Sequence, residues 1–327
     1  MNEDIKGKWI APSNAILPDF IICGAMKCGT TSLHAILDQH PDVYIPKSEV
    51  HFFDINNIYN HPDFFFYDKG VWQYPNMEVN RDALWEWYSN FFRKAPKNSI
   101  IGEDSTNYLA SSESAERIAM QKKPIKAVVC LRNPTKRAYS HYWHMLASGR
   151  SIYNFEDSIK YLPETVLSKS MYYEQVDRYL NKLPGNQIFF FILEEFLQDK
   201  EKVIKELSYF LGIDYDSFPE GAIHAHTNKG VIPTSVNLQI LKNRMLRSLG
   251  GKHYRKHLSP LLEVDDRAPI APRLLEKVHS VVNPQSVKAP PKMKEGTKIF
   301  LDDYFQRELN GLGSLIGKNV ESLWFGS

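Results

Sequence analysis

The sequence predicts an α/β fold with a mostly parallel central sheet flanked by helices. Three segments support this prediction, because in each a run of β-rich apolar residues lies next to a helical pattern; they are residues 19–37, 125–147 and 186–211. Strands that alternate with helices favour parallel pairing through crossover connections. The chain has 327 residues, of which 43% are hydrophobic, so it is long enough to bury such a core.

The first segment reads "FIICGAMKCGTTSLHAILDQHP", residues 20–41. Residues 19–23 are β-rich, a glycine loop follows, and the helix after it ends before Pro41 and carries one apolar face, formed by Leu33, Ile36 and Leu37. The order strand, loop, helix is typical of a phosphate-binding loop.

The glycine loop departs from the loop of ATP- and GTP-binding proteins, G-x-x-x-x-G-K-[ST]. Gly24 and Gly29 keep that spacing, but Thr30 stands in the lysine position and Lys27 precedes Gly29 by two residues. Backbone N–H groups at the start of a helix still bind anions, and hydroxyl groups add donors. We therefore predict a P-loop-like fold whose loop holds one terminal phosphate and a group that leaves from it.

The second segment predicts a buried strand over 125–131 and a helix over 135–147 that starts at Asn133-Pro134. Arg132 leaves the strand end and Ser140 follows eight residues later. An arginine fork with a serine hydroxyl suits a second phosphate monoester, although a surface arginine and a helix serine would give the same pattern. Both loops fall at carboxyl ends of strands, where such sheets bind ligands, so they predict a nucleotide phosphorylated at both ends.

The remaining segments complete one predicted domain, residues 1–327, with a core over about 19–235 and 298–325. A third strand is expected in 186–196, before a helix over 199–211. The aromatic residues 59–98 either pack on the sheet or wall an acceptor pocket. Residues 240–297 are basic and rich in proline, and predict a helical excursion. The last segment should return to the core through residues at helical spacing: Phe300, Leu301, Tyr304, Phe305, Leu309 and Leu312.

Composition excludes several functional classes. The net charge of +2 argues against a general nucleic-acid binder. No stretch is long and apolar enough to span a membrane, and the acidic N-terminus does not suit a signal peptide. Cys23, Cys28 and Cys130 have no disulfide or metal-site spacing and are typical of reduced thiols, which predicts a cytoplasmic protein.

Taken together, these motifs resemble sulfotransferases that depend on 3′-phosphoadenosine 5′-phosphosulfate (PAPS), in their heparan and bacterial carbohydrate branch. "GAMKCGTTSL" resembles the family's 5′-phosphosulfate loop and "LRNPTKRAYSHY" its 3′-phosphate motif. "PKSEVHFFD" resembles the segment with the catalytic glutamate, "HTNKGVIPTS" the late loop over the nucleotide, and "IGKNVESLW" the C-terminal ending. The resemblance runs from about residue 19 to 325.

The resemblance implies that PAPS is the cofactor, that adenosine 3′,5′-bisphosphate is the product, and that no metal is needed. Lys27 would neutralise the 5′-phosphate and the bridging oxygen as sulfur departs, which stabilises the transition state. The other implied nucleotide-binding residues are Cys28, Gly29, Thr30, Thr31 and Ser32 in the first loop, Arg132 and Ser140 in the second, and Lys229 and Gly230 in the late loop.

The acceptor hydroxyl must lose a proton, and Glu49 is the candidate base because a carboxylate after the first helix can face the sulfonate across the strand ends. His51 is a second candidate for the base, although a structural histidine beside Phe52 and Phe53 is equally compatible. Asp54 is a candidate to orient a lysine or the acceptor.

The acceptor is left open between a glycan or glycolipid, a carrier-bound hydroxyacyl chain and a small phenol or steroid. Many heparan-branch relatives have a lysine where Asp104 stands, which argues against a heparan-like sugar, and the aromatic stretch 64–74 favours an acceptor with apolar parts. The basic residues 250–257 suit binding of an acidic carrier protein or an anionic glycan, or simply form a solvated surface. Two other functions compete: a P-loop nucleotide kinase or NTPase, and a non-catalytic nucleotide-binding protein on the same fold.

Overall fold

Five strands form a parallel central sheet in the order β2-β5-β1-β6-β7. The computed structural model describes residues 3–68, 70–224, 230–246, 257–258, 261–262 and 270–326. The sheet strands are β1 (Phe20–Gly24), β2 (Val43–Tyr44), β5 (Ile100–Asp104), β6 (Lys126–Leu131) and β7 (Ile188–Ile192). The predicted fold class, an α/β protein with a parallel sheet, is confirmed.

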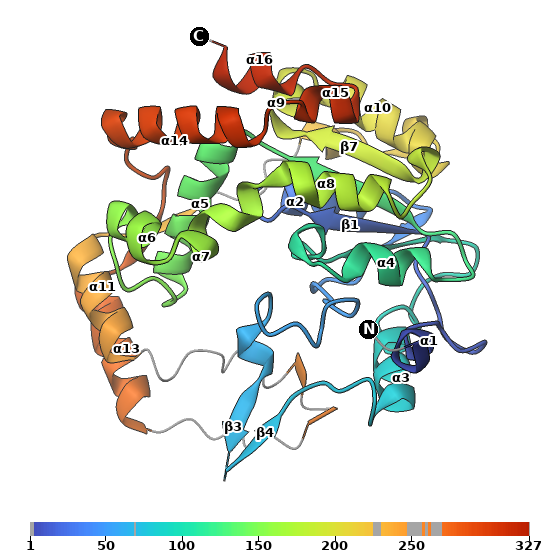
Figure 1. Cartoon of the computed structure of the whole chain (residues 1–327), viewed down its shortest axis with the longest axis horizontal. Coiled ribbons are helices and arrows are strands. Elements are labelled where there is room, and N and C mark those ends of the chain that lie inside the picture. The colour runs from blue at the N-terminus through green and yellow to red at the C-terminus, as the bar shows by residue number, and fades with distance from the viewer. Residues whose placement is uncertain are drawn as a thin grey trace.

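Helices flank this sheet, with α8 lying across the face that is turned to the viewer in Figure 1. On the strands themselves, α2 contacts β1, and α9 and α10 contact β7. The helices are α1 (Glu3–Lys8), α2 (Thr30–Leu37), α3 (Arg81–Asn90), α4 (Ser114–Ala119), α5 (Pro134–Ala147), α6 (Phe155–Tyr161), α7 (Pro163–Leu167), α8 (Tyr172–Leu180), α9 (Leu193–Gln198), α10 (Lys200–Leu211), α11 (Val236–Met245), α13 (Ile270–Val282), α14 (Glu295–Glu308), α15 (Leu312–Ile316) and α16 (Val320–Phe325).

The predicted strands and helices of the three βα segments are confirmed, with one correction. The third strand ends at Ile192, and the residues after it form α9 instead of continuing the strand. Glu194 and Glu195 in the first turn of α9 explain this end, because carboxylates stabilise a helix N-terminus. The structure also adds β2 and β5, which the sequence did not predict as strands.

The aromatic segment divides into a packed part and a projecting part. The α3 side chains Leu84, Trp85 and Tyr88 are buried, and the Tyr88 ring stacks on Phe52 with 4.2 Å between centroids. The short antiparallel strands β3 (Phe66–Asp68) and β4 (Val71–Gln73) form a hairpin that projects away from the sheet (Figure 1), with Trp72 exposed. Packing therefore accounts for the α3 half, and a role for the rest in an acceptor pocket stays a prediction.

The basic excursion contains α11 and α13. Strand β8 (Val231–Pro233) precedes α11, strand β9 (Gln285–Val287) follows α13, and the two strands pair antiparallel. Most of the basic stretch 250–257 lies outside the described residues. The domain boundaries stay a prediction. Within the described ranges, no helix combines the length and apolar character that crossing a membrane requires.

The C-terminal segment returns to the core as expected, except at one position. Four of its predicted apolar residues are buried, and Tyr304 packs partly buried against the same core. Phe300 is 55% exposed, because it lies on the outer side of α14, away from Leu301 and Phe305. The buried residues of the predicted set are Leu301, Phe305, Leu309 and Leu312.

Candidate active site

Three neighbouring strands deliver the candidate residues to one edge of the sheet. The strands β5, β1 and β6 lie side by side and parallel, so their carboxyl ends open at the same edge. Gly24 ends β1, Asp104 ends β5, and Arg132 follows the last residue of β6. The two predicted phosphate loops therefore lie at adjacent strand ends.

The first loop forms an anion cradle at the N-terminus of α2. Gly29 caps the helix in the left-handed conformation, with φ 89°, and the first helical bond runs from Leu33 N–H to the Gly29 carbonyl. The N–H groups of residues 30–32 have no acceptor within the helix, as at any helix start. Thr30 is buried, Ser32 half-buried and Thr31 exposed. This arrangement fits a phosphate.

Two glycines permit close approaches around this cradle. A Cβ at Gly24, where φ is 106°, would lie 2.1 Å from the Thr106 carbonyl oxygen, so only glycine fits between β1 and the chain that follows β5. A Cβ at Gly29 would lie 2.8 Å from Cδ1 of Leu193. The two glycines are thus required by packing against the chain after β5 and against the start of α9, whatever the loop binds.

Lys27 and Arg132 place two positive charges together. An Nη1 N–H of Arg132 donates to the Lys27 carbonyl at 3.1 Å, which joins the two phosphate loops directly. Burial and the nearby Arg132 charge lower the pKa of the Lys27 ammonium. Among the described residues, neither cation has a carboxylate within ion-pair distance. An anion placed here would neutralise both.

Cys28 contributes structure to the loop. Its side chain is fully buried with Sγ 3.5 Å from the Tyr172 hydroxyl, and its N–H donates to the Ala25 carbonyl. Burial raises the pKa of the Cys28 thiol to about 11, so the thiol stays protonated and inert. The thiols of Cys23 and Cys130 are buried as well and unpaired.

The remaining nucleotide candidates differ in how far the structure places them. Ser140 is half-buried on α5, in the helix that Arg132 precedes. Gly230 lies just before β8 and is exposed. Lys229 lies outside the described residues, so its predicted role is not addressed by the structure.

Glu49 is the partly exposed carboxylate of the site. Its Oε2 lies 2.8 Å from Nε2 of His51 and accepts a 2.9 Å hydrogen bond from the Thr106 hydroxyl, while the side chain stays 40% exposed. Burial alone would raise the pKa of Glu49, but these two contacts outweigh it and lower the pKa to about 2. Glu49 is therefore ionised, oriented and open to a ligand.

His51 and Asp54 lie behind Glu49. The His51 side chain is only 5% exposed, and its backbone N–H donates to Oγ of Ser105 at 2.9 Å. Burial would lower the pKa of His51, yet the hydrogen bond and charge of Glu49 raise it. Asp54 is fully buried with Oδ1 2.8 Å from Nε2 of His61. Both residues lie close to Glu49, but of the three only Glu49 is open to solvent, and catalytic roles for His51 and Asp54 stay predictions.

The structure adds residues that sequence reasoning missed. Nδ1 of His34 on α2 lies 3.2 Å from Oδ2 of Asp104, so the Asp104 carboxylate faces the loop helix. Lys169 comes from the 3₁₀ turn Ser168–Ser170 and donates to Oδ1 of Asn107 at 2.6 Å. Burial and nearby cations lower the pKa of Lys169 to about 8. Recognising β5 as a strand would have pointed to Thr106, but no sequence signal marked Lys169.

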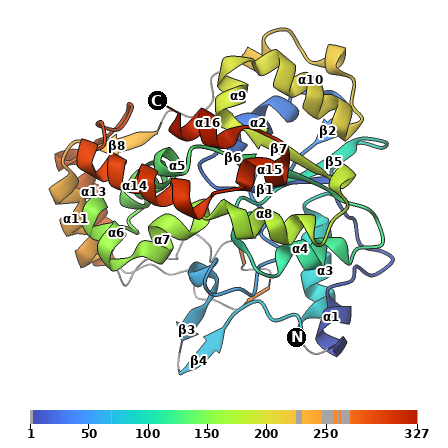
Figure 2. The ribbon, with the colours of Figure 1, turned by 45° about the horizontal axis from the view of Figure 1, so that its top comes forward.

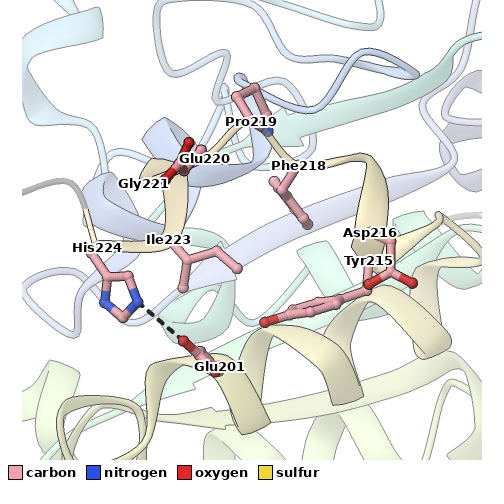
Figure 3. A pocket seen from close by; sticks show the side chains of 9 residues that line it. All are labelled: Glu201, Tyr215, Asp216, Phe218, Pro219, Glu220, Gly221, Ile223 and His224. Atoms are coloured by element: carbon pink, nitrogen blue, oxygen red, sulfur yellow. Dashed lines mark hydrogen bonds and ion pairs between the residues drawn. The ribbon is translucent and has the colours of Figure 1, made fainter.

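A surface hollow between α10 and the turns after it is a different feature. Its lining includes Glu201, Asp216 and Glu220, with His224 3.2 Å from Glu201 (Figure 3). Three carboxylates and one imidazole do not suit a bisphosphate. We therefore place the functional site at the carboxyl edge of the sheet and not in this hollow.

The C-terminal helix supports the second phosphate loop. Figure 2 shows α16 beside α9, and Glu194 of α9 connects the two, because its carboxylate accepts from Nε1 of Trp324 and from the Asn133 N–H, both at 3.0 Å. Nδ2 of Asn133 in turn donates to the Trp324 carbonyl at 2.8 Å. This closed set of bonds fixes the turn that presents Arg132.

The fold and this edge define an α/β protein of the P-loop-like class, with two cationic loops and a carboxylate in one site. Residues 17–262 match the family described as "Sulfotransferase domain", and the chain therefore belongs to that family, as the resemblance implied.

Similar proteins agree with this assignment. The chain is 29% identical over 219 residues to mouse (Mus musculus) bifunctional heparan sulfate N-deacetylase/N-sulfotransferase 4, covering 60% of this chain and 22% of that protein. It is 27% identical over 206 residues to human (Homo sapiens) heparan sulfate glucosamine 3-O-sulfotransferase 3B1, covering 60% and 46%. The chain thus spans less than half the length of these relatives. A crystal structure of a sulfotransferase from Alicyclobacillus acidocaldarius shares the fold, with TM-score 0.61, 24% identity, and coverage of 94% and 99%.

Proposed function

We propose that this protein moves a sulfonate group from PAPS to an acceptor hydroxyl. The observation that carries the proposal is the direct contact between the two phosphate loops, Arg132 Nη1 to the Lys27 carbonyl at 3.1 Å, beside the open carboxylate of Glu49. Two cationic loops joined in this way suit a nucleotide with phosphates at both ends, and the carboxylate suits an acceptor that must lose a proton.

Each of the two loops would bind a different end of the nucleotide. The N–H groups and hydroxyls at Thr30, Thr31 and Ser32 would hold the 5′-phosphate, and Arg132 with Ser140 would hold the 3′-phosphate. Lys229 and Gly230 remain candidates to close over the nucleotide. PAPS supplies the sulfonate. With Lys27 and Arg132 to neutralise charge, the transfer needs no metal in this proposal.

Of the two candidate bases, Glu49 is the more accessible to an acceptor. Its side chain is 40% exposed, whereas His51 is 5% exposed and lies behind it. Glu49 takes the proton of the acceptor hydroxyl, while His51 and Thr106 hold the carboxylate in place. Lys27 faces the phosphate oxygen that is left with negative charge, so it stabilises the transition state more than the ground state. The acceptor gains the sulfonate and adenosine 3′,5′-bisphosphate remains.

The proposed acceptor is a glycan or glycolipid, or a carrier-bound hydroxyacyl chain presented by an acidic carrier protein. The heparan sulfate names of the relatives support the glycan. The Asp104–His34 pair puts a carboxylate where a sugar-associated lysine is expected, which supports an acceptor that differs from heparan. The unpaired buried thiols support a cytoplasmic site of action.

Calorimetric titration tests the nucleotide site first. We expect adenosine 3′,5′-bisphosphate to bind more tightly than ADP or ATP with Mg²⁺, and Arg132→Ala to abolish this preference. Arg93→Ala is the matched control, because the Arg93 side chain is 53% exposed and, among the described residues, pairs only with Glu86. Preference for ATP, or wild-type affinity in Arg132→Ala, would replace the sulfotransferase proposal with a P-loop kinase.

A further inference from the structure

Three buried metal-ligand side chains converge behind Glu49. His51, Asp54 and His61 each offer one ligand atom, and these atoms lie within 4.8 Å of one another. The residues are 4%, 0% and 5% exposed in that order, so water does not compete freely for them. Two imidazoles and one carboxylate in a dry space are a costly arrangement unless each polar atom has a partner.

The partners within the cluster are incomplete. Nδ1 of His51 is buried and has no hydrogen-bond partner among the residues that the structure describes. Oδ1 of Asp54 and Nε2 of His61 lie 2.8 Å apart, so the carboxylate and this imidazole already face one another. A divalent ion bound here would replace the proton that these two atoms can share, because metal ligands must be deprotonated.

Glu49 sets the tautomer of His51. If Nε2 of His51 carries the proton shared with Glu49 at 2.8 Å, the lone pair of a neutral ring is on Nδ1, the buried nitrogen without a partner. A carboxylate that accepts from one ring nitrogen while the other binds a metal is the usual support of a metal-bound histidine. The Glu49 contact therefore prepares His51 to act as a ligand.

The surrounding charges leave Asp54 available. The Arg117 guanidinium, which lies near Asp54, donates to the Phe53 carbonyl and Oδ1 of Asn56 instead. The second oxygen of Asp54 accepts a long 3.4 Å bond from Asn60. Lys169 is a further nearby cation and will weaken, without blocking, the attraction of a divalent ion.

We propose that His51, Asp54 and His61 form a binding site for a borderline divalent transition metal, of which Zn²⁺ is the best fit. Two nitrogens and one oxygen favour Zn²⁺ over Mg²⁺ or Ca²⁺, which prefer all-oxygen sites. Three protein ligands leave one position of a tetrahedral ion open. The site does not depend on the proposed sulfonate transfer, because it is defined without the nucleotide loops.

Titration of the untagged full chain with ZnCl₂, without nucleotide, tests the site. We expect one Zn²⁺ per chain, released protons, and no competition from excess Mg²⁺. His61→Gln should weaken binding by more than about 100-fold, because removing a ligand should exceed the ~10–100-fold effect of losing an outer partner. His224→Gln is the control, since that exposed histidine pairs with Glu201 elsewhere. No binding by the wild type, or equal affinity in His61→Gln, overturns the proposal.

X-ray absorption of the Co²⁺-loaded wild type keeps the proposal testable if His61→Gln does not fold. The expected first shell has two imidazoles and a carboxylate oxygen. A sulfur ligand, or a single imidazole, would place the metal elsewhere and overturn the assignment. Because neither measurement uses PAPS or an acceptor, its failure would leave the proposed transferase function untouched.

Discussion

Oε2 of Glu49 lies 2.8 Å from Nε2 of His51, and the two side chains differ eightfold in exposure, 40% against 5%. Glu49 is therefore open to solvent, and His51 fixes its carboxylate from behind. The Thr106 hydroxyl adds a second fixed contact at 2.9 Å, so the carboxylate is held from the chain that follows β5 as well as from its own segment.

Glu49→Gln should abolish most turnover and leave nucleotide binding intact. Glutamine still accepts from Thr106 but cannot take a proton, and general-base assistance is typically worth ~10²–10⁴ in rate. Single-turnover rates with PAPS and an active acceptor, beside calorimetry with adenosine 3′,5′-bisphosphate, separate the two effects. Glu86→Gln, an exposed glutamate on α3, is the control. Wild-type turnover in Glu49→Gln would remove Glu49 as the base.

Gly24→Ala should damage stability and nucleotide binding together. The added Cβ would lie 2.1 Å from the Thr106 carbonyl oxygen, so β1 must move away from Thr106. Thr106 is the residue whose hydroxyl donates to Glu49, so the carboxylate would shift as well. Overpacking costs about 1–3 kcal/mol, and a left-handed φ adds about 1–2 kcal/mol. Thermal unfolding and bisphosphate affinity measure the two effects.

Gly212→Ala is the control for backbone strain at Gly24. Gly212 has φ 83°, but a Cβ there meets nothing within 4 Å. This variant should lose only about 1–2 kcal/mol of stability, from the left-handed φ, and keep its nucleotide affinity. If the two alanine variants bind the nucleotide equally well, the close approach at Gly24 has no role in shaping the cradle.

The difference between these glycines also shows what the sequence could predict. The Gly24 to Gly29 spacing and Arg132 are local signals, so the loops that follow β1 and β6 were predictable from the residues around them, while their phosphate-binding role stays a prediction. The contact of Gly24 with Thr106 depends on β5, a five-residue strand with a glycine and two acids that carries no alternating apolar pattern. A strand that lacks an apolar pattern of its own and is defined by pairing with its neighbours cannot be predicted from local periodicity.

The same reason explains the missed charges of the site. His34 meets Asp104 across 70 residues, and Lys169 meets Asn107 across 62. Neither pair has a fixed spacing that a motif could encode. The candidate catalytic segment could be singled out because Glu49, His51 and Asp54 lie within six residues, but His61, the partner of Asp54, was not identified.

Glu194→Ala should weaken bisphosphate binding although Glu194 need not touch the ligand. The change leaves the Asn133 N–H and Nε1 of Trp324 without their acceptor, and an unsatisfied buried group costs about 1–3 kcal/mol. The turn before α5 then loses its support, and Arg132 loses its position. Calorimetry and thermal unfolding on the same samples measure both.

Glu195→Ala is the matched control next in sequence. Within the described part of the chain the Glu195 side chain pairs only with Lys318, at 2.6 Å. Both side chains are partly exposed, and such surface pairs contribute about 0–1 kcal/mol. Nucleotide affinity should be unchanged. Equal losses in the two variants would show that α9 as a whole, and not the Glu194 bonds, supports the loop.

Lys169 should make the stability of the wild type rise with pH in the alkaline range. Its folded pKa of about 8 lies below the ordinary value of 10.5, so between these values the unfolded chain binds more protons than the folded one. Stability from this group is therefore absent below about pH 8 and gained as pH rises toward 10.5, by up to roughly 3 kcal/mol.

Urea unfolding of wild type and Lys169→Met across that range isolates the effect as a difference. Lys182→Met, at a lysine whose side chain is 44% exposed, controls for the loss of a charge. If the free energies of unfolding of the wild type and Lys169→Met change in parallel with pH, Lys169 keeps its proton in the folded protein over this range. Its environment is then more polar than its contact with Asn107 indicates.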